Sequence, residues 1–287
     1  MDNRTEPLRH SRRDDGGISL QLRTNLFLGT AEMGEKILRY LVGVGDIFIP
    51  EVFDGGKLTG GRKVKFDPGD LGLPLKGWVD ERYSLGIIAE RHRPVDSSLR
   101  VSATDFLMFD HLGLRVDSKW FVDKARLDKF VAIAKDLYVI TGANSGYIQN
   151  WRLERALGEI TDEHGKLVGY KAPGVQWSLR GIFWANFFGP EYVQMFGRDR
   201  LLSAPWYKTE DLPDSGLLLL ISESPFDADK PDYQERKKQI YAHLGDDAFT
   251  GNLLPEFRTD GRKKKDARPL IQSGGVRDDI FAAKGDR

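Results

Sequence analysis

Gly181-Ile-Phe-Trp-Ala-Asn-Phe-Phe188 is apolar at nearly every position, and Asn186 is its one polar side chain. Side chains alternate between the two faces of a strand, so this segment predicts a strand that is apolar on both faces. Such strands are usually internal to a sheet and covered on both sides. We therefore interpret Trp184 and Phe187 as core residues. The alternative is that Trp184 and Asn186 line a recognition groove.

The predicted strand passes directly into a short helix. Gly189 breaks the strand, and Pro190 suits the first position of a helix, where its missing N–H costs no hydrogen bond. Gly197 ends this helix. Together with the two core residues named above, these three positions form the predicted structural motif of the chain.

Three longer helices are predicted from apolar residues at helical spacing. They cover residues 30–42, 124–141 and 230–244. Thr30 can cap the first helix, and Gly142 stops the second.

The predicted strands occur in runs, with few helices between them. This order predicts an α+β fold with largely antiparallel strands and with helices packed on one face. The order strand, helix, strand, strand recurs after residue 180, which allows two similar lobes on one sheet or on two. The predicted strands are 18–28, 46–53, 63–66, 83–92, 99–109, 120–123, 145–151, 180–188 and 217–222.

Four segments follow from this pattern. Residues 1–17 are polar and predict a disordered tail, because they offer little apolar surface to bury. We expect an N-terminal α+β lobe over residues 18–151 and a C-terminal lobe, packed on the first, over residues 152–250. Residues 251–287 predict a loose charged tail that contains the basic run 262–265.

Composition excludes several classes of protein. The chain has 43 Lys and Arg residues and 43 Asp and Glu residues, so its formal net charge is zero, which argues against nucleic acid as the main partner. It has no Cys, which excludes disulfides, a thiolate nucleophile and cysteine-bound metal. No apolar run is long enough for a membrane helix, and no secretory signal is evident, so we expect a cytoplasmic protein without membrane contact.

The familiar catalytic motifs are missing from the sequence. The five histidines form no H-x-x-x-H pattern, and the phosphate-binding G-x-x-x-x-G-K-[ST] and hydrolase G-x-S-x-G motifs do not occur. We therefore predict no catalytic residues, no metal and no cofactor. The nearest acid–base group is Asp105, Asp110 and His111, with Glu90 and His92 on the neighbouring predicted strand. Glu90, Asp105, Asp110 and His111 would suit a hydrolase if one cleft held them together. The alternative is ordinary solvated charge at hairpin edges.

Four tryptophans lie near predicted loops or strand ends, where they are either core residues or anchors for a partner. These candidate partner-binding residues are Trp78, Trp120, Trp151 and Trp206.

Residues 181–197, followed by Leu201-Leu-Ser-Ala-Pro205 and by residues 211–225, resemble the C-terminal half of bacterial immunity proteins from type VI secretion and polymorphic toxin systems. In that family a tryptophan-bearing strand, a short helix and a Leu-Pro-x-Gly-Gly-x-Leu strand recur in this order. The chain departs from the pattern at Ser215-Gly216, where the family has a Gly-Gly pair.

The resemblance implies a non-catalytic protein that binds and neutralises a cognate toxin. Acidic pairs such as Asp211/Asp214 and Asp227/Asp229 would then face a basic surface of the toxin and steer its approach. Two other functions stay open, namely the hydrolase described above and a structural or assembly protein of a mobile element. The sequence leaves the oligomeric state open.

Overall fold

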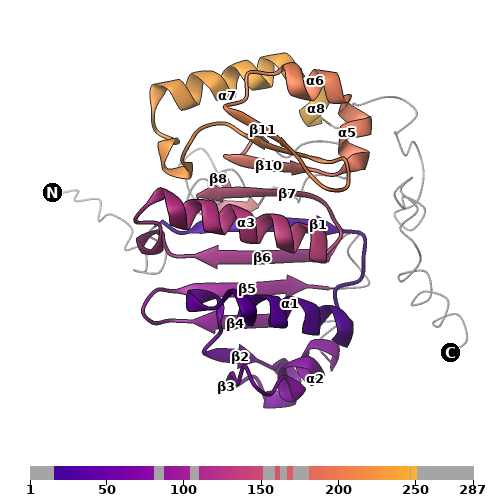
Figure 1. The fold of residues 1–287 in the computed structure, drawn as a ribbon, viewed down its shortest axis with the longest axis vertical. Coiled ribbons are helices and arrows are strands. Elements are labelled where there is room, and N and C mark those ends of the chain that lie inside the picture. The colour runs from indigo at the N-terminus through magenta and orange to yellow at the C-terminus, as the bar shows by residue number, and fades with distance from the viewer. Residues whose placement is uncertain are drawn as a thin grey trace, which may run out of the picture.

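The computed structural model describes residues 16–80, 87–103, 110–150, 159–161, 167–170, 181–245 and 247–250. Ten strands of these residues form one antiparallel sheet in the order β11-β12-β10-β7-β1-β6-β5-β4-β2-β3, and β8 and β9 pair separately. Figure 1 shows the sheet running the length of the molecule. The strands are β1 (Ile18–Thr24), β2 (Val52–Asp54), β3 (Lys63–Lys65), β4 (Ile87–Arg91), β5 (Ser97–Ser102), β6 (Asp110–Val116), β7 (Ala143–Asn150), β8 (Glu159–Thr161), β9 (Leu167–Tyr170), β10 (Ala185–Phe188), β11 (Lys208–Asp211) and β12 (Leu217–Leu220).

Helices come mainly between strands and at the C-terminal end of the described chain. The α-helices are α1 (Ala31–Val44), α2 (Gly72–Asp80), α3 (Lys124–Ile140), α5 (Pro190–Phe196), α6 (Arg198–Ser203), α7 (Pro231–Leu244) and α8 (Asp247–Thr250). The 3-10 helices are η1 (Asp46–Phe48), η2 (Gly56–Thr59), η3 (Ser118–Trp120) and η4 (Pro225–Asp227). No helix in the described part of the chain is both long and apolar enough to span a membrane.

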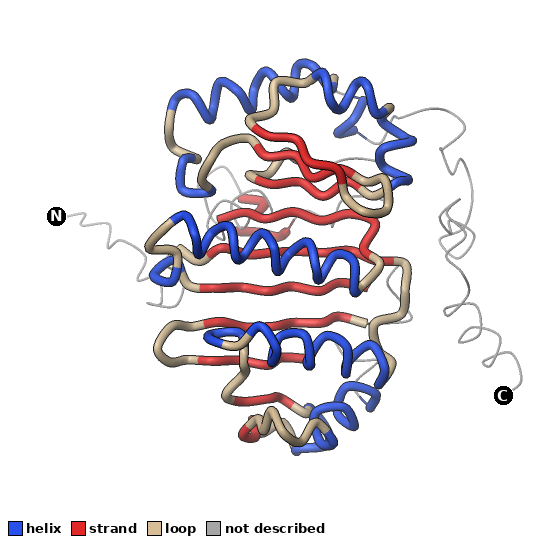
Figure 2. Tube along the Cα trace, in the orientation of Figure 1, coloured by secondary structure: helices blue, strands red, loops and turns tan. Residues whose placement is uncertain are grey.

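Helices α1 and α3 lie side by side across one face of the sheet (Figures 1 and 2). The central strand β1 shows why, because Ile18, Leu20 and Leu22 alternate with polar residues and are almost completely buried. The two helices are linked at their surface, where the Tyr40 hydroxyl of α1 donates to Asp136 of α3 at 2.7 Å. The α+β fold and its antiparallel sheet are therefore confirmed.

Strand β10 joins the two halves of the chain. It pairs with β7 on one side and β12 on the other, which makes it an internal strand. One sheet therefore extends across both of the expected lobes. The expected tails lie outside the described residues, except for Gly16 and Gly17.

The structural motif around β10 places helices on both faces of the sheet. Phe187 stacks on Tyr138 of α3, with ring centroids 5.5 Å apart. Phe188, the next residue, points to the opposite face, where it stacks on Tyr192 of α5 at 6.3 Å. Trp184 is buried and donates from Nε1 to the Ser222 carbonyl at 3.0 Å.

The helix of this motif begins and ends at the residues that the sequence predicts. Helix α5 begins at Pro190 and is capped at its C-terminal end by Gly197, which has a φ of +83°. A side chain at Gly189 would collide with the backbone, because its Cβ would lie 2.5 Å from the Asn144 carbonyl oxygen.

Two local predictions need correction. Residues 46–53 form the 3-10 helix η1 and then the short strand β2 rather than one strand, since Gly45 and Asp46 both have positive φ values of 71° and 57°. Trp120 ends η3, and residues 121–123 form no strand.

The two edges of the sheet are short. Strand β3 has three residues, of which Lys63 and Lys65 are exposed. Strand β11 at the other edge has four residues, and all but Glu210 are exposed.

Candidate functional site

The four residues of the expected hydrolase site are not brought together in the described structure. Asp110 and His111 are neighbours on β6, so their side chains point to opposite faces of the sheet. Asp110 is fully buried and accepts a hydrogen bond from the Leu28 N–H at 2.7 Å. Glu90 pairs with Ser98 and His111 with Ser102, which sets them four positions, or about 13 Å, apart along β5. Asp105 lies outside the described residues.

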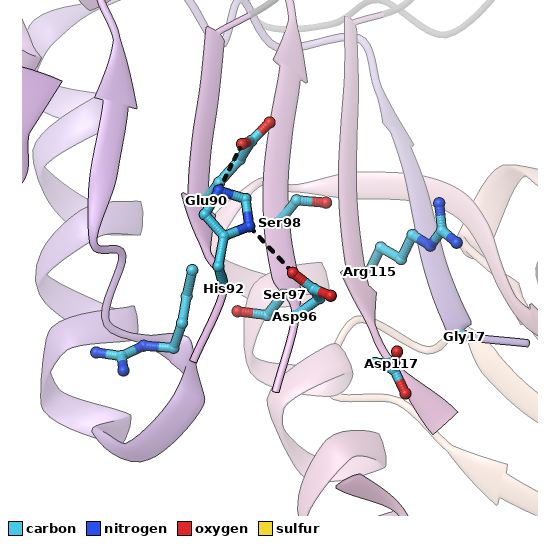
Figure 3. Close-up of a pocket in the computed structure, with 9 residues that line it drawn as sticks. Gly17, Glu90, His92, Asp96, Ser97, Ser98, Arg115 and Asp117 are labelled. Carbon is cyan, nitrogen blue, oxygen red and sulfur yellow. Dashed lines mark hydrogen bonds and ion pairs between the residues drawn. The ribbon is translucent and has the colours of Figure 1, made fainter. Parts of the chain in front are cut away.

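A different acid–base group forms where β4 ends. His92 lies between two carboxylates, with Nδ1 3.0 Å from Asp96 Oδ1 and Nε2 3.4 Å from Glu90 Oε2 (Figure 3). Glu90 also pairs with Lys63 at 2.5 Å. These residues line a shallow cavity of about 160 Å³, together with Ser98, Arg115 and others.

This cavity is poorly suited to acid–base catalysis in its present geometry. A general base needs one imidazole nitrogen directed at the substrate. Both nitrogens of His92 face carboxylates instead. We interpret the group as an ion-pair network that ties β4 to the turn before β5. The described residues contain no group of three or more His, Asp or Glu side chains arranged for a metal ion.

The described tryptophans of the candidate set are held by hydrogen bonds inside the fold. Trp78 is completely buried and donates to the Leu28 carbonyl at 2.7 Å. Trp120 is 2% exposed and donates to Asp46 at 3.2 Å. This burial favours the core alternative over the partner-anchor alternative for these two rings.

The other two candidate tryptophans are Trp206 and Trp151. Trp206 is partly buried and donates to the Leu201 carbonyl at 2.7 Å. Trp151 lies outside the described residues.

The two candidate aspartates also have partners within the chain. Asp214 accepts from the Tyr138 hydroxyl at 2.6 Å and from the Gly216 N–H at 2.9 Å, so it joins α3 to the turn between β11 and β12. Asp211 is exposed and forms an ion pair with Arg198. Both carboxylates therefore have a role within the fold.

Three large apolar side chains are exposed in or beside the turns that lead into α3, β11 and α7, and the sequence analysis did not single them out. Val122 is 69% exposed, Tyr207 48% and Phe226 43%. We call this set the apolar corner. Val122 comes two residues before α3 and Phe226 five residues before α7, and both helices begin at the left of Figure 1.

Two members of the apolar corner have ring contacts in the structure. Phe226 lies in η4, which Ser224 and Asp227 cap reciprocally, and its ring is 6.1 Å from that of Phe121, the residue before Val122. Tyr207 precedes β11, and the Arg236 guanidinium of α7 lies 5.9 Å from its ring centroid.

Charged side chains surround the apolar corner. Lys124 of α3 forms an ion pair with Asp128 at 2.7 Å. That hydrogen bond raises the pKa of Lys124, and the negative charge of Glu223 raises it further. Acidic residues on either side of a Pro-Phe pair were the sequence signal for this corner.

Comparison with known proteins gives little further guidance. No protein-family model and no curated protein matches the chain. Among solved structures, a Pseudomonas aeruginosa T6SS protein, PA0821, is similar at a TM-score of 0.48 and 11% identity, over 78% of this chain and 73% of that one. This is a weak likeness, and it says nothing about a partner.

Proposed function

We propose that this chain is a non-catalytic immunity-type protein that binds a cognate protein toxin in the cytoplasm and neutralises it through the apolar corner. The observation that carries the proposal is the exposure of Val122, Tyr207 and Phe226, three large apolar side chains in or beside the turns that lead into α3, β11 and α7. Contiguous exposed apolar surface with a polar rim is typical of protein–protein binding sites.

The resemblance to immunity proteins supports the same location. The residues that carry the resemblance, 181–197, 201–205 and 211–225, include β10, β12 and the last residue of β11. Tyr207 immediately precedes β11, and Phe226 follows directly after residue 225. Two of the three apolar side chains therefore lie beside the segments that resemble the family.

Neutralisation by contact requires no chemistry from the chain. The hydrolase alternative would need Glu90, Asp110 and His111 in one pocket. The burial of Asp110 on the other face of the sheet favours binding over hydrolysis.

The test is protection of a bacterial host against the toxin encoded beside this gene. Co-expression of the chain should restore growth, and the two proteins should co-purify. The variant Val122→Ser, Tyr207→Ser, Phe226→Ser should lose protection and bind at least 100-fold more weakly, because truncating central apolar anchors removes most of the binding energy.

A matched control comes from exposed apolar side chains elsewhere. Leu73 is 43% exposed and Val139 55% exposed. The variant Leu73→Ser, Val139→Ser should protect as well as the native protein. Protection that survives the corner variant, or a turnover that His111→Gln abolishes, would overturn the proposal. Absence of protection together with capture of assembly proteins would favour the mobile-element alternative.

A further inference from the structure

Strand β11 is an open edge of the ten-stranded sheet. It pairs with β12 on one side, and no other strand in the described part of the chain pairs with its outer side. Lys208, Thr209 and Asp211 are exposed, although helix α7 runs near this edge in Figure 1. The backbone of β11 is therefore accessible to a further strand.

The hydrogen bonds of the β11–β12 hairpin show which backbone groups point outward. The Leu212 N–H donates to the Gly216 carbonyl at 3.0 Å, and these two residues lie one position beyond the Asp211–Leu217 pair. Hydrogen-bonded and non-hydrogen-bonded pairs alternate along an antiparallel ladder, so Thr209 and Asp211 both belong to non-hydrogen-bonded pairs. The N–H and C=O groups of these two residues thus point away from β12, toward the open edge.

The side chains of β11 carry opposite charges on either side of Thr209. Lys208 and Glu210 lie on the same face of the strand, with Lys208 Nζ 3.3 Å from Glu210 Oε2. Lys135 of α3 binds the other oxygen of this carboxylate, Oε1. The edge therefore offers one cation and one anion, placed symmetrically about a residue whose backbone groups point outward.

We infer that two copies of the chain associate through β11 as an antiparallel pair, with Thr209 of one copy opposite Thr209 of the other. The outward backbone groups of the two threonines then exchange two hydrogen bonds. Lys208 of each copy lies opposite Glu210 of the other, and cross-strand pairs of opposite charge are favourable, as are pairs of threonines. The inference goes beyond the proposed function and does not depend on it.

The charges of β11 also select this register over its neighbours. A two-fold axis places the residue at the centre of the pairing opposite its own copy. Moving that axis by one residue, to Lys208 or to Glu210, sets two like charges directly against each other, which is unfavourable. The Thr209-centred register is therefore the one in which the charged side chains of β11 are complementary.

The expected dimer is weak and closed. Strand β11 has four residues, so its pairing buries much less than the roughly 1,600 Å² of a standard protein interface. We therefore expect a Kd of about 100 µM, which leaves the chain largely monomeric at low micromolar concentration. A two-fold contact uses the same edge of both copies, so association through it stops at two.

Sedimentation equilibrium of the full chain, at concentrations from about 5 to 500 µM, measures this association. Thr209→Pro removes the central N–H, which does not contribute to the ladder with β12, and should weaken the dimer at least tenfold. The matched control is Thr209→Val, which keeps the N–H and the β-branched side chain. Its Kd should stay within about threefold of the native value.

Two charge variants test the register. Lys208→Glu leaves two acidic side chains at the facing positions, and Glu210→Lys leaves two basic ones, so each variant alone should dimerise at least tenfold more weakly than the native chain. An equimolar mixture of the two should dimerise at least as tightly as the native chain, because each position then faces its opposite charge. Lys36→Glu, at an exposed position of α1, controls for net charge and should stay within about twofold of the native Kd.

Single-cysteine variants report which residue faces its own copy, because the chain has no Cys. Thr209→Cys should form a disulfide-linked dimer on mild oxidation, since the Cα atoms of a hydrogen-bonded antiparallel pair are about 5.5 Å apart. Asp211→Cys is the control on the same strand. In this register residue 211 lies about 14 Å from its own copy, too far for a disulfide.

A native chain that stays monomeric up to about 500 µM would overturn the inference. A dimer that Thr209→Pro and both charge variants leave intact would also overturn it, because the copies would then meet elsewhere. Loss of toxin binding by Thr209→Pro, in a chain that stays monomeric, would assign β11 to a strand of the toxin and would overturn association between copies.

Discussion

Ser215 adopts a backbone φ of +70°, in the left-handed region that favours glycine. It is also the position at which the chain departs from the Gly-Gly pair of the immunity proteins that it resembles. Ser215→Gly should raise the free energy of unfolding by about 1 kcal/mol, because an L-residue pays about that amount to hold this conformation. Urea denaturation measures the change.

The control is Ser215→Ala, which removes the hydroxyl and keeps the Cβ. It should change stability by less than about 0.5 kcal/mol. A gain in the alanine variant equal to that in the glycine variant would show that backbone conformation is not the cause.

His111 links stability to pH. Burial, and to a smaller extent the charge of Arg23, lowers its pKa to about 4. The imidazole titrates near 6.5 when unfolded, so the unfolded chain takes up a proton first as the pH falls. The contribution of neutral His111 is complete above pH 6.5 and is lost between pH 6.5 and 4, at up to about 1.4 kcal/mol per pH unit.

Urea denaturation at pH 7 and pH 5 tests this sign. Between pH 7 and pH 5 the free energy of unfolding of the native protein should fall by up to about 2 kcal/mol. That of His111→Gln should fall by correspondingly less. An unchanged loss in His111→Gln would contradict the assignment to that imidazole.

At the scale of elements, the junction between β10 and α5 depends on close backbone contact. Gly189 donates from its N–H to the Asn144 carbonyl at 2.8 Å, and an added Cβ would lie 2.5 Å from that oxygen. Gly189→Ala should therefore destabilise the protein by about 2 kcal/mol. Thermal unfolding measures the loss.

Gly43 offers the matched control, because it lies in α1 and an added Cβ there would have no atom within 4 Å. Gly43→Ala should stabilise the protein by about 0.5 kcal/mol through helix propensity. Equal destabilisation by both substitutions would mean that crowding at Gly189 is not responsible.

Elements with a regular apolar pattern could be predicted from the sequence. Helices α3 and α7 were predicted to within one residue at each end, and α5 is bounded by the expected Pro190 and Gly197. Helix α2 was missed, because Gly72, Pro74 and Gly77 suggest loops. It is stabilised from outside its own sequence, since Trp78 packs so closely on Gly34 of α1 that a Cβ there would lie 2.7 Å from the indole.

The apolar corner, like helix α2, could not be predicted from the sequence. Its three members lie at positions 122, 207 and 226, and the ring of Phe226 in η4 is 6.1 Å from that of Phe121, the residue before Val122. Sequence spacing could flag the acids beside Phe226, but it could not show that Trp78 and Trp120 are buried while Val122 is exposed. Burial of a single side chain depends on tertiary contacts that periodicity does not report.

At the scale of the whole molecule, one sheet and one core connect both halves of the chain. Ile148 of β7 pairs with Ala185 of β10, and both are fully buried in the same hydrophobic cluster. We therefore expect a single cooperative unfolding transition, with equal calorimetric and van't Hoff enthalpies. Differential scanning calorimetry makes the measurement, and two resolved transitions would show that the halves unfold independently.

The short, lysine-bearing strand β3 at one margin of the sheet has a consequence for behaviour at high concentration. An exposed edge strand can pair with a strand of another molecule, whereas charged side chains on a short edge strand such as β3 disfavour that pairing. Two copies that met at β3 would bring Lys63 and Lys65 against their equivalents. The protein should accordingly stay dispersed when overproduced, rather than growing into fibres.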